Sequence, residues 1–363
     1  MGIDNRALGL RSGTISQWLV AEPCAIRYNC DMPEESHSPN AGAPKDSLFK
    51  VLSLDGGGAK GFYTLGILDE IEKNTDRPIH ASFDLIFGTS TGAIIAALLA
   101  RGDSVEHVLK LYRAHVPAIM RCKSAEKRTA ALRSAAHDIF SDTTVDNFKT
   151  GIGIVATNWK EERPLIFKVS KDQAHGSKGS FVPFFGVSVS DAIVASCSAY
   201  PFFNTHKVTK SNGDSVELGD GGFCANNPTL YGIADATRAL KQRNENVRVI
   251  SLGVGQYPEP SIWKKVKLAR GGFPMLRHSL NLDFVQKILA TNIASMDQLR
   301  EVLFKDVKTV RINDAFVEPE MATDLLEHDL GKLDRIVQKG RLSYVKHEGV
   351  ILEYLSEPNT RTV

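Results

Sequence analysis

A serine in a tight turn is the first residue of this sequence whose surroundings suggest chemistry. Ser90 lies in Gly88-Thr89-Ser90-Thr91-Gly92, between an apolar segment and a run of small apolar residues. A sharp strand-to-helix turn presents a serine hydroxyl at its tip, and it needs the small flanking residues that Gly88 and Gly92 supply. The amide groups at the start of the next helix would favour developing negative charge. Ser90 is therefore predicted to be a nucleophile, and a packing turn without chemistry is the alternative.

A second feature is the glycine-rich segment Asp55-Gly56-Gly57-Gly58-Ala59-Lys60-Gly61. Consecutive glycines let the backbone approach a ligand closely, and N–H groups at a helix start attract a phosphate or an oxyanion. A Walker A loop is excluded because the lysine precedes the last glycine. A dinucleotide-binding loop fits the glycine spacing, but the acidic residue Asp84 starts the second strand instead of ending it. A tight structural turn stays open as an alternative, and the nearby serine turn favours an oxyanion hole.

A base must take the proton from such a serine, and Asp220 is the best candidate. It lies in Leu218-Gly219-Asp220-Gly221-Gly222, a loop that follows a short predicted strand. A carboxylate can act as the base directly when its pKa or its geometry is favourable. A Ser–His–Asp arrangement would instead use a histidine late in the chain. The candidates His278, His328 and His347 each have polar neighbours typical of surface histidines.

Composition places the chain among ordinary globular proteins. It has 363 residues, a formal net charge of +2 and 42% hydrophobic residues. These values exclude a disordered or collagen-like chain, and the near-neutral charge argues against a nucleic-acid binder. The five cysteines are odd in number, and none forms a Cys-x-x-Cys pair. We expect reduced thiols and no zinc site.

No targeting or membrane-spanning segment is predicted. The N-terminus has no apolar signal core, and the longest apolar run, residues 85–100, is interrupted by the serine turn. A span needs about 20 consecutive apolar residues. The expectation is a cytoplasmic protein that meets membranes only at their surface.

The elements that must position these residues alternate between strand and helix. Strands are predicted at 49–54, 83–89, 153–158, 165–169, 247–253 and 307–312. Helices are predicted at 59–74, 91–101, 105–115, 125–137, 191–200, 227–241, 280–304, 322–338 and 342–355. This order predicts an α/β fold with a mostly parallel central sheet and helices on both faces. Residues 1–46 are predicted to be a flexible N-terminal extension, and residues 47–363 one domain with a helical C-terminal extension.

With these motifs, the sequence resembles the patatin-like phospholipases. Residues 55–61 resemble that family's glycine-rich oxyanion motif, with Lys60 where arginine is usual. Residues 88–92 resemble its serine turn, and Asp220-Gly221-Gly222 its aspartate motif. Residues 195–203, 226–228 and 251–255 agree with further family segments, so the resemblance covers about 49–255.

The resemblance implies a three-layer fold and a catalytic dyad without histidine. Ser90 would attack a fatty-acyl ester, Asp220 would accept its proton, and an acyl-enzyme would form and be hydrolysed. The amides of Gly57, Gly58 and Ala59 would hold the oxyanion, with no metal or cofactor. The remaining motif residues are Gly56, Lys60, Gly61, Gly88, Gly92, Gly221 and Gly222.

A closer resemblance is to the bacterial patatin-like phospholipases of anti-phage signalling that a cyclic dinucleotide of the cyclic GMP–AMP type activates. It implies a separate allosteric site for an anionic ligand, a homodimer and membrane phospholipid as substrate. Two basic stretches, within 263–277 and 113–133, are candidates for contact with lipid head groups or nucleotide phosphates. The alternatives are a constitutive esterase or lipase of the same fold and a non-catalytic nucleotide-binding module.

Overall fold

The computed structural model describes residues 48–176, 178–258 and 273–356, and their side chains except those of 273–283. Within these residues the chain forms an eight-stranded sheet in the order β5-β6-β3-β2-β1-β7-β8, with β4 paired to β3. The strands are β1 (Phe49–Leu54), β2 (Leu85–Thr89), β3 (Gly151–Asn158), β4 (Arg163–Lys168), β5 (His206–Thr209), β6 (Ser215–Asp220), β7 (Val247–Leu252) and β8 (Lys308–Ile312).

The centre of the sheet is parallel and one side of it is antiparallel. The pairs β1–β2, β1–β7, β2–β3 and β7–β8 are parallel, whereas β3–β4, β3–β6 and β5–β6 are antiparallel. Strands β1 and β2 are buried along their whole length, as expected of central parallel strands with both faces covered. The prediction of a mostly parallel α/β sheet is confirmed.

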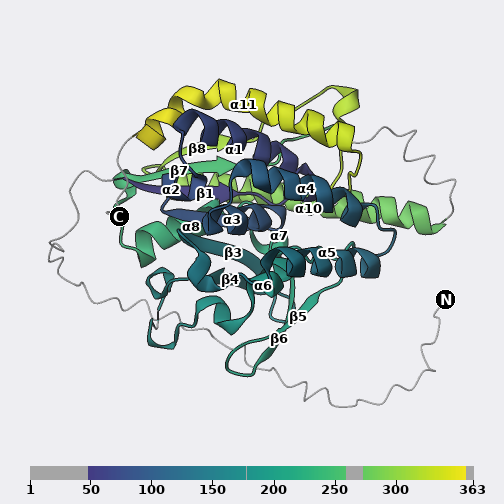
Figure 1. Cartoon of the computed structure of the whole chain (residues 1–363), viewed down its shortest axis with the longest axis horizontal. Coiled ribbons are helices and arrows are strands. Elements are labelled where there is room, and N and C mark those ends of the chain that lie inside the picture. The colour runs from purple at the N-terminus through teal and green to yellow at the C-terminus, as the bar shows by residue number, and fades with distance from the viewer. Residues whose placement is uncertain (1–47, 177, 259–272, 357–363) are drawn as a thin grey trace, which may run out of the picture. The chain divides into compact units, whose positions relative to one another are not determined.

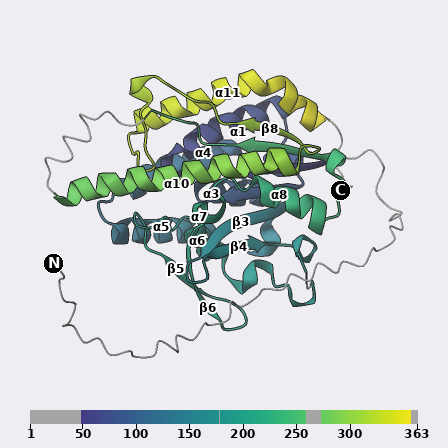
Figure 2. The same ribbon diagram turned by 180° about the vertical axis from the view of Figure 1, so that it is seen from behind.

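Helices cover both faces of this sheet (Figures 1 and 2). They are α1 (Gly61–Thr75), α2 (Ile79–Ser82), α3 (Thr91–Arg101), α4 (Val105–Met120), α5 (Ala125–Phe140), α6 (Val189–Ser196), α7 (Gly222–Ala225), α8 (Thr229–Ala234), α10 (Phe273–Leu303) and α11 (Leu330–Ser356). Leu52 packs in the larger core with α1, α3, α4, α5, α6 and α11, whereas its neighbour Val51 packs on the other face with α7 and α8. Helix α10 crosses that second face (Figure 2).

The carboxyl ends of β2 and β6 lie next to each other in the sheet. β2 runs parallel to β3 and ends where Thr89 pairs with Val155. β6 runs antiparallel to β3 and ends where Asp220 pairs with the next residue, Ala156. The ends of β2 and β6 therefore meet along one edge of β3. The topology places the residue after Thr89 next to the last residue of β6.

The C-terminal part of the prediction was wrong. Residues 322–338 and 342–355 were expected to form two helices separated near Gly340, but the structure has the single helix α11. Gly340 is not a break, because it permits close packing: a Cβ there would lie 2.1 Å from the carbonyl oxygen of Tyr63 on α1. Upstream of α11, the Glu327 carboxylate accepts the amides of His328 and Asp329, which satisfies that backbone without a helix.

Other boundaries differ by a few residues. α6 ends at Ser196, four residues earlier than expected. α8 begins at Thr229, where the predicted cap Asn227 accepts the Thr229 amide, and it continues as a π-helical turn, Asp235–Ala239.

In the described ranges no single helix is long and apolar enough to span a membrane; one bent pair, Lys178–Gly186 with Val189–Ser196, meets the length and composition test. The proposed N-terminal extension lies outside the described residues.

Candidate active site

Ser90 sits on a strained turn between β2 and α3. Its φ and ψ are 52° and −121°, which a non-glycine residue rarely adopts. A Cβ at Gly88 would lie 2.3 Å from the carbonyl oxygen of Gly92, and one at Gly92 would lie 2.3 Å from that of Leu54. Both glycines are therefore required by close backbone packing, as the sequence motif predicted. The Ser90 amide donates to the Ser196 hydroxyl (2.9 Å), which fixes the turn to α6.

Asp220 lies at the end of β6 and faces Ser90. The residue is 3% exposed, and its carboxylate accepts a hydrogen bond from the Gly222 amide (2.7 Å) and lies beside the Ser90 hydroxyl. Burial raises the pKa of Asp220 to about 6, and its interactions with the Ser90 hydroxyl and the Gly222 amide partly offset that rise. A raised pKa makes this carboxylate a stronger proton acceptor than an exposed aspartate.

The glycine loop lies on the other side of Ser90. Gly58 has a φ of +59°, and a Cβ on it would lie 2.5 Å from the Leu325 carbonyl oxygen. The Ala59 amide donates to that same oxygen (3.1 Å), so the expected role of Ala59 as an oxyanion donor is not supported. The amides of Gly57 and Gly58 make no hydrogen bond to any described residue, and both glycines line the pocket that holds Ser90 and Asp220.

Two contacts that the sequence analysis missed hold this loop in place. Arg311 on β8 forms a two-pronged ion pair with the fully buried Asp55 (2.9 and 2.5 Å). Asn226 and Gly56 form two hydrogen bonds. The Gly56 amide donates to the main-chain carbonyl of Asn226 (2.9 Å), and the Asn226 side-chain amide donates to the Gly56 carbonyl (3.1 Å). A buried aspartate before the glycines signals a cationic partner, but 256 residues separate Asp55 from Arg311.

An apolar pocket of about 70 Å³ opens at Ser90. Its walls come from α3, α4, α5 and the segments after α6 and before α11, and they include Ile94, Val116, Ile119, Met120, Leu132, Phe202, Phe203 and Leu325. A second apolar pocket, of about 40 Å³, shares Ile94, Val116, Ile119 and Leu132 with the first and extends between α4 and α5. An apolar tail bound at Ser90 would continue in this direction.

No histidine lines the described part of the serine pocket. His328 is exposed with its ring beside the Leu326 carbonyl, His347 bonds its own helix at Ser343, and the side chain of His278 is outside the description. Buried Cys197 does line the pocket, and burial raises the pKa of its thiol. Among described residues no group of three or more His, Cys, Asp or Glu side chains could hold a metal.

The structure describes the basic stretch within 113–133 but only the end of the one within 263–277. Residues 259–272 lie outside the description. In the other stretch, Arg113 pairs with Asp334, Arg128 donates to the Phe202 carbonyl, and Arg133 contacts His206. These arginines join elements of the fold, which is the ordinary structural role.

Comparison with known proteins agrees with this geometry. The family described as patatin-like phospholipase matches residues 52–233. The chain belongs to this family. As a patatin-like phospholipase it is a serine hydrolase, and the expectation drawn from the serine, glycine and aspartate motifs is confirmed at that level.

Its relatives include enzymes with named activators. A cUMP-AMP-activated phospholipase of Escherichia coli is 53% identical over 310 residues, which are 85% of this chain and 95% of the relative. A cGAMP-activated phospholipase of Pseudomonas aeruginosa is 29% identical over 217 residues, 56% of this chain and 62% of the relative. The crystal structure of VipD from Legionella pneumophila aligns with a TM-score of 0.41 and 14% identity, covering 86% of this chain and 68% of that one.

Proposed function

We propose that this protein hydrolyses fatty-acyl esters of membrane phospholipids with Ser90 and Asp220, and that a cyclic dinucleotide activates it in anti-phage defence. The observation that carries the proposal is the placement of the Ser90 hydroxyl beside the buried Asp220 carboxylate, at the mouth of an apolar pocket. A strained serine, a buried base and glycine amides without a partner in the described ranges together suit acyl transfer.

The chemical steps follow from these positions. Asp220 takes the proton as Ser90 Oγ attacks the ester carbonyl, and the amides of Gly57 and Gly58 stabilise the oxyanion, each by roughly 3–4 kcal/mol. The tetrahedral species collapses, the ester C–O bond breaks, and Asp220 returns the proton to the leaving alkoxide. Water then gives its proton to Asp220 and attacks the acyl-enzyme. The fatty acid leaves, and Ser90 regains its hydrogen.

The activator is proposed from the relatives. The E. coli relative is named as activated by cUMP-AMP, and it matches 85% of this chain at 53% identity. We therefore put cyclic UMP–AMP first among the candidate ligands, ahead of cyclic GMP–AMP.

The walls of the serine pocket support a regulated enzyme. Helices α4 and α5 form its apolar walls and also enclose the adjoining apolar pocket. We propose that these helices move apart when a long acyl chain enters beside Ser90. A constitutive esterase would need no such step.

The test is fatty-acid release from phospholipid vesicles by wild type and Ser90→Ala, with and without cyclic UMP–AMP. We expect release by wild type only with the nucleotide, and none by Ser90→Ala. Equal release without nucleotide would support the constitutive esterase instead. Tight nucleotide binding with no release from any ester would support the non-catalytic alternative.

We also propose, on the sequence alone, a cytoplasmic location, a homodimer and surface contact with the inner membrane during activity. No catalytic metal or cofactor is proposed.

A further inference from the structure

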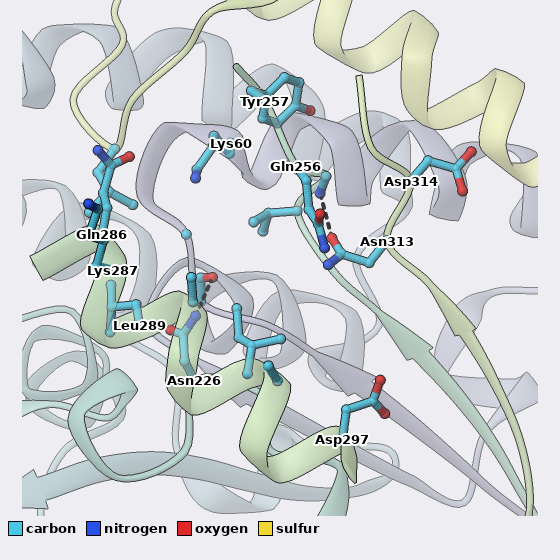
Figure 3. A pocket seen from close by; sticks show the side chains of 18 of the residues that line it. Lys60, Asn226, Gln256, Tyr257, Gln286, Lys287, Leu289, Asp297, Asn313 and Asp314 are labelled. Carbon is cyan, nitrogen blue, oxygen red and sulfur yellow. Dashed lines mark hydrogen bonds between the residues drawn. The ribbon is translucent and has the colours of Figure 1, made fainter. Parts of the chain in front are cut away.

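A second and larger cavity, of about 750 Å³, lies behind the glycine loop (Figure 3). Gly56, Gly57 and Lys60 form one wall, and α10 forms the opposite wall with residues from Gln286 to Glu301. Gly57, Asn226, Leu289 and Leu325 line both this cavity and the serine pocket. The two cavities therefore adjoin each other at this loop. A molecule bound in the larger one would touch the backbone that we assign to the oxyanion.

Its chemistry differs from that of the acyl pocket. Amide side chains line it: Gln256, Gln286, Gln298 and Asn313. Such groups both donate and accept, as the edges of nucleobases require. Lys60 and Lys287 add positive charge near the glycine loop, and the carboxylates of Asp297 and Glu301 lie toward the other end. Carboxylates can accept from the exocyclic amino group of a base. An acyl chain would leave these polar groups without partners.

Lys60 is the most unusual of these groups. Figure 3 shows its side chain entering the cavity from the glycine-loop side. It makes no hydrogen bond or ion pair with another residue in the described ranges. Burial lowers the pKa of its ammonium to about 8, with Asp324 opposing that effect. A phosphodiester beside it would add a second negative charge to that of Asp324.

The cavity wall is connected to both halves of the catalytic site. On α10 the Asn292 side chain accepts the Asn226 amide (2.8 Å) and donates to the Cys224 carbonyl (3.0 Å). Asn226 holds Gly56 through two hydrogen bonds, and Cys224 is on α7, which follows Asp220 directly. A ligand that shifts α10 would therefore act on the oxyanion loop and on the segment after the base.

We infer that this cavity is the binding site for the cyclic dinucleotide, with Lys60 and Lys287 facing its phosphates and the amide side chains facing its bases. This inference rests on the proposed function, since it locates the activator named there. The volume lies within the range of about 300–1,000 Å³ that small-molecule sites occupy.

The experiment is isothermal titration calorimetry of cyclic UMP–AMP into the full-length protein. Ala294→Trp places an indole in the cavity from α10, and Ser295→Trp is its control, an exposed neighbour that does not line the cavity. We expect Ala294→Trp to weaken binding about 100-fold or more, and Ser295→Trp to bind as wild type does.

A second variant with a matched control distinguishes loss of the site from a folding defect. Lys287 and Lys305 are both exposed, and only Lys287 lines the cavity. Lys287→Glu should weaken binding about 10-fold or more, and Lys305→Glu should not. Wild-type affinity in both Ala294→Trp and Lys287→Glu would overturn this site while leaving the activator intact. A wild-type protein that binds neither cyclic UMP–AMP nor cyclic GMP–AMP would instead contradict the activator part of the proposed function.

Discussion

At the scale of single residues, the burial of Asp220 serves chemistry and opposes stability. A carboxylate in an apolar pocket binds a proton more tightly than one in water, and this raises its pKa to about 6. The same group must ionise at neutral pH without the solvent that the unfolded chain would give it. Activity and stability therefore depend on this residue in opposite directions.

The first prediction is the pH dependence of turnover. Because Asp220 must be ionised to accept the Ser90 proton, kcat/KM should rise as pH passes about 6 and level off above it. Asp220→Asn should lower the rate by about 10²–10⁴-fold and remove this acid limb. A steady-state profile with the activated protein measures both. An acid limb that persists unchanged in Asp220→Asn would assign the titration to another group.

The second prediction concerns folding stability. A carboxyl whose folded pKa is about 6 favours the folded state below its ordinary pKa of 3.8, and this contribution disappears as pH rises through 6. Asp220→Asn avoids ionisation, so it should be more stable than wild type at pH 8 by about 3 kcal/mol. The difference should fall to about half of that at pH 5. Urea unfolding at both pH values measures it, and a variant less stable at pH 8 would contradict the argument.

The third prediction concerns Lys60. Its pKa of about 8 means that raising the pH removes the charge in the free protein. Affinity for cyclic UMP–AMP should therefore fall as pH rises above 8, by up to about tenfold per unit until the pKa of the bound state is reached. Lys60→Arg stays charged and should give a flat profile. Equal slopes in both proteins, measured by calorimetry at pH 7 and 9.5, would remove Lys60 from the site.

At the scale of elements, the packing of α1 against α11 depends on two glycines. A Cβ on Gly340 would lie 2.1 Å from the Tyr63 carbonyl oxygen, and one on Gly66 would lie 2.2 Å from that of Val337. Because the contacted atoms belong to the backbone, no side chain can rotate away to make room for the added Cβ. Close approach of these helices also buries Leu333, Ile336 and Val337.

The fourth prediction uses this contact. Gly340→Ala should destabilise the fold by about 1–3 kcal/mol, since the added methyl overpacks the interface. Gly349→Ala, on the same helix with nothing within 4 Å of its added Cβ, should instead stabilise by about 0.4–1 kcal/mol. Thermal unfolding compares the two. Equal effects would show that the interface tolerates the methyl.

The fifth prediction concerns the helices around the serine pocket. Leu132 on α5 lines both apolar pockets, so a larger side chain there should shorten the acyl chain that fits. Leu132→Trp should lose hydrolysis of long-chain esters and retain that of butyrate esters. A competition assay with mixed chain lengths measures the ratio. An unchanged ratio would place the acyl chain elsewhere.

Sequence reasoning succeeded where the signal was local. The serine turn needs its glycines because of backbone contacts within a few residues, and a strand followed by a helix is visible in the apolar pattern. It failed where distant segments cooperate. Asp55 binds Arg311 of β8, and Asn226 binds Asn292 of α10. The single helix α11 was predicted as two helices, because its packing against α1 through Gly340 could not be seen in the sequence.

At the scale of the whole molecule, two cavities of different chemistry adjoin at one loop. The apolar one contains Ser90, and the polar one faces α10 and contains Lys60. The Asn292–Asn226–Gly56 hydrogen bonds join α10 to that loop. Ligand binding in the polar cavity and acyl-chain binding in the apolar one would then be coupled, and by linkage each would strengthen the other.

The most direct test of this account is covalent labelling of Ser90 by a fluorophosphonate, followed by peptide mass spectrometry, with and without cyclic UMP–AMP. We predict rapid labelling of Ser90 with the nucleotide, slow labelling without it, and none in Ser90→Ala. Asp220→Asn should stay slow even with the nucleotide. Labelling of Ser90 at the same rate in all conditions, or labelling at another serine alone, would contradict the account.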